Sequence, residues 1–233
     1  MTHGAIFDFN GTMILDGPYQ EEAWRTWARN NLGLELSDED FAYHLHGVSI
    51  GECLEFMLGR WPTPDETDAA ELEREQLYRD LCRIHSDACQ LAEGLPGFLD
   101  ALADLGVRIT IATASPLENM EFHFERLGLD RWFSLDTIVY NDRTFPSKPA
   151  PDIFVRAMDR IGVPAARCTV FEDAPLGLEA ARRAGAGRVV AVTAEYDPEF
   201  LAGLPGVDRV IADYRDTEGL LATVLATTDA DEA

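Results

Sequence analysis

The sequence is poor in basic residues. Its 233 residues include 19 lysines and arginines against 42 aspartates and glutamates, which gives a formal net charge of −23. A surface with this charge repels a phosphate backbone or an anionic membrane over most of its area. We therefore expect neither nucleic acid nor a membrane as a partner.

Long apolar runs and paired cysteines are missing as well. No stretch approaches the ~18 apolar residues of a membrane span, and the start MTHGAIFDFNGT lacks the basic segment and cleavage site of a signal peptide. Cys53, Cys82, Cys89 and Cys168 show no C-x-x-C spacing, which argues against a zinc site and a disulfide framework. The sequence thus predicts a cytoplasmic protein with reduced thiols.

The hydrophobic content of 46% is sufficient for a core of ordinary density. The apolar run GAIFDF predicts a buried strand that carries Asp8. From residue 19 to residue 91 the patterns are helical, and SDED and TPDE are typical of helix starts with acids in the first turn. We therefore predict a helical insert over residues 16–91.

After residue 92 strands and helices alternate. Predicted strands cover residues 107–113, 136–140, 168–173 and 187–193, and an edge strand covers 207–214. This order requires a parallel sheet with helices on both faces. The fold class is therefore α/β, a doubly wound, Rossmann-like parallel sheet formed by residues 1–15 and 92–233.

Polar side chains gather where the predicted strands end. Asp8 follows the first strand, Thr113 the second, and Glu172 and Asp173 a later one. Ligands bind beyond the carboxyl ends of such strands, and carboxylate oxygens suit Mg²⁺. The only lysine, Lys148, lies in the turn-rich stretch FPSKPAPDIF, where a compact ammonium can hold phosphoryl oxygens. Asp8 would attack phosphorus and form an aspartyl phosphate.

Four stretches carry a family resemblance. DFNGT, ATAS, SKPAPDIF and VFEDAPLGLEAARRAG resemble the four signature motifs of the haloacid dehalogenase superfamily, and the helical insert resembles the cap of its β-phosphoglucomutase and phosphoglycolate phosphatase branch. The resemblance implies that residues 16–91 form a cap that sets substrate specificity. It implies Asp8 as nucleophile and Mg²⁺ ligand, the backbone carbonyl of Asn10 and the carboxylate of Asp173 as further ligands, and Glu172 as support for the metal shell.

The same resemblance assigns binding roles. Thr113 and Lys148 bind the transferring phosphoryl group, and the stretch HGVS matches the specificity loop of that branch. The expected substrate contacts are Gly11, Thr12, His46, Gly47, Val48, Ala114 and Ser115.

Asn10 departs from the family pattern. Phosphatases and mutases of this superfamily usually have an aspartate there, which protonates the leaving oxygen and then activates water, a contribution of about 10²- to 10⁴-fold. Three explanations stay open: a slow or specialised phosphatase whose leaving group needs little protonation, a proton supplied by His46, or a position changed to trap a phosphorylated state.

Related reactions fit less well. The insert has no lysine for the Schiff base of phosphonoacetaldehyde hydrolases, and the pair Glu172 and Asp173 disfavours the metal-free dehalogenases. Mutases of the branch have an arginine near the place of Ile50. We therefore predict a Mg²⁺-dependent phosphatase of a small phosphorylated metabolite, as a monomer or homodimer. A phosphosugar mutase and a phosphate-binding or regulatory module without turnover are the alternatives.

Overall fold

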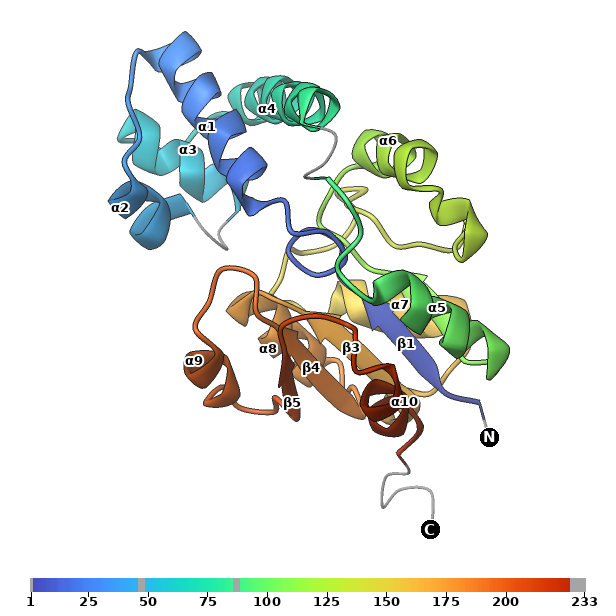
Figure 1. Cartoon of the computed structure of the whole chain (residues 1–233). Helices are drawn as coiled ribbons and strands as arrows, with labels where there is room; N and C mark the ends of the chain where they lie inside the picture. Colours follow the sequence, from blue (N-terminus) through green and yellow to red (C-terminus); the bar gives the residue numbers. More distant parts are fainter. Residues whose placement is uncertain (1, 46–48, 86–88, 227–233) are drawn as a thin grey trace. The chain divides into compact units, whose positions relative to one another are not determined.

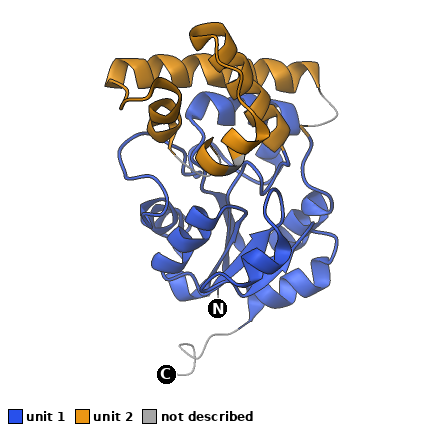
Figure 2. Cartoon of the chain, turned by 90° about the vertical axis from the view of Figure 1, so that its left-hand side faces the viewer, with its two compact units in different colours: residues 1–15, 90–233 blue, residues 16–89 orange. Residues whose placement is uncertain are grey.

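The computed structural model describes residues 2–45, 49–85 and 89–226 (Figure 1). The chain divides into two compact units, residues 1–15 with 90–233 (unit 1) and residues 16–89 (unit 2), which Figure 2 colours separately. Across the described ranges, none of the helices combines the length and apolarity needed to cross a membrane.

Unit 1 alternates strands and helices. Its elements are β1 (Gly4–Phe7), α5 (Leu95–Asp104), β2 (Arg108–Ile111), α6 (Leu117–Leu127), η2 (Leu129–Arg131), α7 (Asp152–Ile161), η3 (Ala165–Arg167), β3 (Cys168–Glu172), α8 (Pro175–Arg183), β4 (Arg188–Val192), α9 (Pro198–Ala202), β5 (Arg209–Ile211) and α10 (Thr217–Leu225). The strands form one parallel sheet in the order β2-β1-β3-β4-β5. The predicted α/β fold with a parallel sheet is confirmed.

This strand order places a topological switch point next to β1. The chain runs from β1 outward to β2 and then returns to the other side of β1 to form β3. Ligands of doubly wound sheets bind at the carboxyl ends of the strands at such a point. The residues that follow β1 and β3 are therefore the first place to look for a site.

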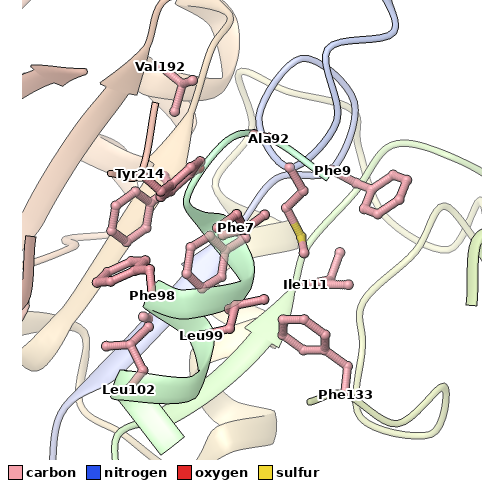
Figure 3. Packing of buried hydrophobic residues seen from close by; sticks show 14 of the residues in the cluster. Phe7, Phe9, Ala92, Phe98, Leu99, Leu102, Ile111, Phe133, Val192 and Tyr214 are labelled. Atoms are coloured by element: carbon pink, nitrogen blue, oxygen red, sulfur yellow. The ribbon is translucent and has the colours of Figure 1, made fainter. Parts of the chain in front are cut away.

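Hydrophobic cores fill both faces of the sheet, as alternating side chains require. On one face Phe7 stacks on Phe171 with ring centroids 4.7 Å apart, and Phe98 of α5 and Tyr214 complete an aromatic cluster (Figure 3). On the other face Ile6 packs among buried residues of α7 and α8. The resulting two-sided burial anchors β1, which carries Asp8 at its end.

The predicted strand over residues 136–140 is wrong. This stretch pairs with the sheet only through an isolated bridge between Val139 and Ala112. Ser134 begins a turn, because its carbonyl accepts hydrogen bonds from the N–H groups of Thr137 and Ile138. The turn leaves too few extended residues for a ladder, so this stretch forms a single backbone bridge to the sheet.

Unit 2 is helical in its described residues. It contains α1 (Gly17–Leu32), α2 (Asp38–Asp40), η1 (Phe41–Leu45), α3 (Ile50–Leu58) and α4 (Pro64–Ile84). The predicted helix starts at SDED and TPDE are confirmed as capping boxes, Ser37 with Asp40 and Thr63 with Glu66. Trp24, Trp27 and Leu54 belong to its own hydrophobic core.

Candidate active site

The site begins at Asp8, directly after β1. Its backbone N–H donates a hydrogen bond to the carbonyl of Phe171 at 2.9 Å, which extends the parallel pairing of β1 with β3 by one residue. The side chain of Asp8 is buried. Strand pairing therefore fixes the backbone of Asp8 at the switch point of the sheet.

A tight turn follows Asp8. The carbonyl of Phe9 accepts hydrogen bonds from three successive backbone N–H groups, the first being that of Thr12. Gly11 has φ +77°, which favours glycine, and a Cβ atom there would collide with the carboxylate of Asp173. The hydroxyl of Thr12 donates to Oδ1 of Asp173 at 3.1 Å. The turn after β1 is thus closely packed against the residue that follows β3.

Lys148 connects the two strand ends. Its Nζ atom donates to Oδ1 of Asp8 and to Oε2 of Glu172, each at 2.6 Å. Burial alone lowers the pKa of Lys148, but the carboxylates of Asp8 and Glu172 outweigh burial, and the pKa is raised above its ordinary value. The only lysine of the chain is therefore a charged ammonium held between two buried acids.

Glu172 is the last residue of β3 and is almost completely buried. Its Oε1 atom accepts a hydrogen bond from the backbone N–H of Ala174 at 3.2 Å. Gly177 in α8 leaves room for this carboxylate, because a Cβ atom at that position would overlap it. The sequence alone did not reveal this dependence on a helical glycine.

Three carboxylates form a cluster that fits a divalent cation. Asp8, Glu172 and Asp173 each offer an oxygen, and these oxygens lie within 4.8 Å of one another. Burial and the neighbouring charges of Glu172 and Asp8 raise the pKa of Asp173 well above its ordinary value. One ammonium does not balance three acids, so a bound cation would relieve this repulsion. Hard oxygen donors in this number are those that Mg²⁺ prefers.

The loop after β2 meets the turn after β1 through one short hydrogen bond. The hydroxyl of Ser115 donates to Oδ1 of Asn10 at 2.6 Å, while the backbone N–H of Ser115 donates to Oγ1 of Thr113 at 3.1 Å. Thr113 is buried, and its backbone N–H donates to the carbonyl of Val139 at 2.9 Å. This arrangement brings Thr113 and Ser115 to the same end of the sheet as Asp8.

Four expected substrate contacts remain, and the structure describes one of them. Ala114 is exposed in the loop after β2. His46, Gly47 and Val48 lie outside the described residues. Their predicted role as a specificity loop stays a prediction.

One further residue and one pairing of residues at this end of the sheet were missed from the sequence. Tyr214 is fully buried, and its hydroxyl donates to the carbonyl of Thr12 at 3.2 Å. Nothing in the pattern VDRVIADY separates this tyrosine from an ordinary core residue. The partnership of Ser115 with Asn10 was also missed, because it joins residues 105 positions apart.

Comparison with protein-family models matches residues 2–185 to the haloacid dehalogenase-like hydrolase family. The chain is 31% identical to the fructose-1-phosphate phosphatase YqaB of Escherichia coli K12 over 185 residues, which are 78% of this chain and 92% of that protein. It is 30% identical to hexitol phosphatase A of the same organism, over 83% of this chain and 84% of that protein.

A solved structure supports the same relationship. A hydrolase of haloacid dehalogenase family IA, variant 3, from Entamoeba histolytica superposes with a TM-score of 0.87 at 31% sequence identity. The match covers 92% of this chain and 95% of that one. Fold and sequence therefore agree on the family.

Proposed function

This chain belongs to the haloacid dehalogenase-like hydrolase family, and on that premise we propose that it is a Mg²⁺-dependent phosphatase of small phosphorylated carbohydrates. The names of two relatives, a fructose-1-phosphate phosphatase and a hexitol phosphatase, support the substrate class. The observation that carries the proposal is the pairing of Asp8 with Lys148 inside a cluster of three carboxylates.

In this proposal Asp8 is the nucleophile. One of its carboxylate oxygens attacks phosphorus in line with the ester oxygen, and the product of this step is an aspartyl phosphate. Water then attacks the phosphorus, and the carboxylate of Asp8 is released. Burial of Asp8 and its fixed backbone support this role because a held nucleophile needs little reorganisation before attack.

Lys148 and Thr113 would bind the phosphoryl oxygens. The ammonium of Lys148 already lies at hydrogen-bond distance from Oδ1 of Asp8, so it is close to the place where the phosphoryl group would form a bond. A fixed positive charge at this place stabilises the negative charge on the equatorial oxygens. Thr113, at the end of β2, would add a hydroxyl donor.

Asp8, Asp173 and the backbone carbonyl of Asn10 would hold Mg²⁺, with Glu172 supporting the shell. When bound, the ion neutralises phosphoryl charge as a Lewis acid. Thr12 and Gly11 keep Asp173 in position, through a hydrogen bond and by leaving space.

Unit 2 would act as a substrate-specificity cap. In the sequence it is inserted into unit 1 shortly after the Asp8 turn, between residues 15 and 90. We propose that its residues contact the carbohydrate part of the substrate and exclude bulk water during transfer.

The test is phosphate release from a panel of hexose and hexitol phosphates. We expect turnover with Mg²⁺, loss of turnover after chelation, and loss of turnover in Asp8→Asn, whose circular dichroism spectrum in Mg²⁺-free buffer should match that of the unmodified chain. Phosphate release by Asp8→Asn at the rate of the unmodified chain would refute the nucleophile. Metal binding without any phosphorylation of Asp8 would favour a phosphate-binding module instead.

A further inference from the structure

The amide of Asn10 has a defined orientation. Oxygen-to-oxygen hydrogen bonds measure about 2.5–3.0 Å, whereas those from nitrogen to oxygen measure about 2.7–3.2 Å. The contact between the Ser115 hydroxyl and Asn10 measures 2.6 Å. In this contact the hydroxyl donates and the amide oxygen Oδ1 of Asn10 accepts. Ser115 thus holds the carbonyl side of the amide and is a positioning residue.

The side-chain amide of Asn10 can donate hydrogen bonds, but it cannot act as a general acid or base. Cleavage of a phosphate ester releases an oxyanion, which a general acid normally protonates. Among the described residues gathered here, the acids are Asp8, Glu172 and Asp173, which are assigned to attack and to metal binding. Lys148 donates hydrogen bonds to two of these carboxylates, those of Asp8 and Glu172. The described part of the site therefore contains no carboxylic acid or imidazole assigned to the leaving oxygen.

We infer that the site cleaves phosphate esters faster the more acidic their leaving oxygen is, so that within the proposed carbohydrate class a phosphate on an anomeric carbon is cleaved faster than one on a primary alcohol of a hexose or hexitol. An anomeric oxygen leaves more readily than the oxygen of a primary alcohol, because the ring oxygen withdraws electron density from it. This inference rests on the proposed function and names the substrate class of the same site.

The two steps of the proposed reaction require only the phosphate ester and water. In the first step the bond from Asp8 to phosphorus forms, and the bond from phosphorus to the leaving oxygen breaks. The leaving oxygen keeps the electron pair and takes its proton from solvent. In the second step the oxygen of water bonds to phosphorus, the Asp8 carboxylate leaves with its electron pair, and the proton of water goes to solvent.

The second step lacks a base as well. With an acidic leaving group the first step is faster than this hydrolysis, so the phosphorylated form of Asp8 accumulates and the first turnover is faster than the later ones. The value of kcat then reports hydrolysis of the aspartyl phosphate, whereas kcat/KM reports release of the leaving group. Dependence on the leaving group is therefore measured on kcat/KM.

Asn10→Asp is a matched variant for the test. Aspartate has nearly the shape of asparagine, and the Ser115 hydroxyl can donate to a carboxylate oxygen as it does to the amide oxygen. The variant thus restores an acid and keeps the contact that positions it. Ser115→Ala in the Asn10→Asp background removes that contact and leaves the acid.

The experiment measures kcat/KM with Mg²⁺ for aryl phosphates of graded phenol acidity, for phenyl and alkyl phosphates, and for glucose 1-phosphate against glucose 6-phosphate. We expect kcat/KM of the unmodified chain to fall steeply as the leaving oxygen becomes more basic. Asn10→Asp is expected to match it on the most acidic phenol and to exceed it by about 10²- to 10⁴-fold on alkyl esters. Ser115→Ala in that background is expected to lose part of the gain on alkyl esters only.

An equal ratio of Asn10→Asp to the unmodified chain over the whole panel would overturn the inference. A shallow dependence in the unmodified chain would overturn it too, and would direct attention to His46 as a proton donor. If the proposed function itself is wrong, the result differs from both of these. The unmodified chain and Asn10→Asp then release no phosphate from any ester, or the release persists when Asp8 is replaced with Asn.

Discussion

Nζ of Lys148 lies 2.6 Å from Oδ1 of Asp8, although 140 positions separate the two residues in the chain. The same ammonium lies 2.6 Å from Glu172. One cation therefore joins the loop before α7 to the ends of β1 and β3. Its position makes Lys148 both an electrostatic support of the fold at this point and the proposed contact of the phosphoryl group.

Removal of Lys148 tests both roles. Lys148→Ala is expected to lower kcat/KM by about 10²- to 10³-fold, as for one charge-stabilising donor. Without Mg²⁺ the variant is also expected to melt at a lower temperature, because Asp8 and Glu172 lose their partner. Arg182→Ala removes a cation on α8 that pairs with the part-exposed Glu179 and is the control for a mere loss of positive charge. Equal activity of the two variants would contradict the role of Lys148.

Metal binding is expected to stabilise unit 1. A ligand that binds only the folded state adds about 2.7 kcal/mol at a concentration of 100 times its Kd. We expect Mg²⁺ to raise the melting temperature of the unmodified chain, and Asp173→Asn to abolish most of this shift. Asp104→Asn changes an exposed aspartate of α5 and should retain the full shift. A shift of the same size in Asp173→Asn would contradict the assignment of this carboxylate.

Two glycine-to-alanine substitutions test whether the space left by a helical glycine is needed. Gly177→Ala places a Cβ atom into the carboxylate of Glu172, whereas Gly97→Ala in α5 meets no atom within 4 Å. Gly177→Ala should lower both kcat/KM and the melting temperature. Gly97→Ala should leave activity unchanged and stabilise the chain by about 0.4–1 kcal/mol. Thermal melts and phosphate release on both variants measure this, and a harmless Gly177→Ala would contradict the packing argument.

A buried hydroxyl supports unit 2. The hydroxyl of Tyr78 donates to Oδ2 of Asp16 at 2.6 Å, and Gln20 donates to the same oxygen at 3.0 Å. Hydrogen bonds to charged groups contribute about 1.5–3 kcal/mol, so Tyr78→Phe should reduce the free energy of unfolding by this amount. Tyr43→Phe makes the same change at an exposed position and should stay within about 0.5 kcal/mol. Urea unfolding compares the two, and equal values would contradict the prediction.

The capping box at the start of α4 predicts that the stability of the protein depends on pH. Hydrogen bonds from Arg60 and from the backbone of Thr63 lower the pKa of Glu66 from 4.5 to about 2. Because the folded pKa is lower than the unfolded one, the stabilisation is complete above about pH 4.5 and is lost as the pH falls toward 2. The melting temperature of the unmodified chain should therefore exceed that of Glu66→Gln at neutral pH. The difference between the two should shrink as the pH falls from about 4.5 toward 2. A difference that stays constant down to pH 2 would contradict the role of the charge.

The order of strands and helices could be predicted because each element has its own local signal. Apolar runs identify the buried strands, and the capping boxes at Ser37 and Thr63 identify helix starts. The strand predicted over residues 136–140 was wrong because its β-rich composition says nothing about the turn at Ser134 that precedes it. Local propensity is a weak guide where tertiary geometry decides.

The site was partly predictable for a related reason. Asp8, Glu172 and Asp173 lie at strand ends, and parallel strands bring their ends together. Lys148 was identifiable by its rarity in the sequence. The contacts of Tyr214, Gly177 and Ser115 depend on side-chain packing between distant segments, which a single sequence does not encode in any local pattern.

The most direct test of the proposed mechanism is the mass of the protein after rapid acid quench with an aryl phosphate and Mg²⁺. We predict one phosphoryl group per chain on the peptide that contains Asp8, and none in Asp8→Asn. Release of phosphate from the unmodified chain without a phosphoryl group on that peptide, or equal labelling of Asp8→Asn, would contradict the account.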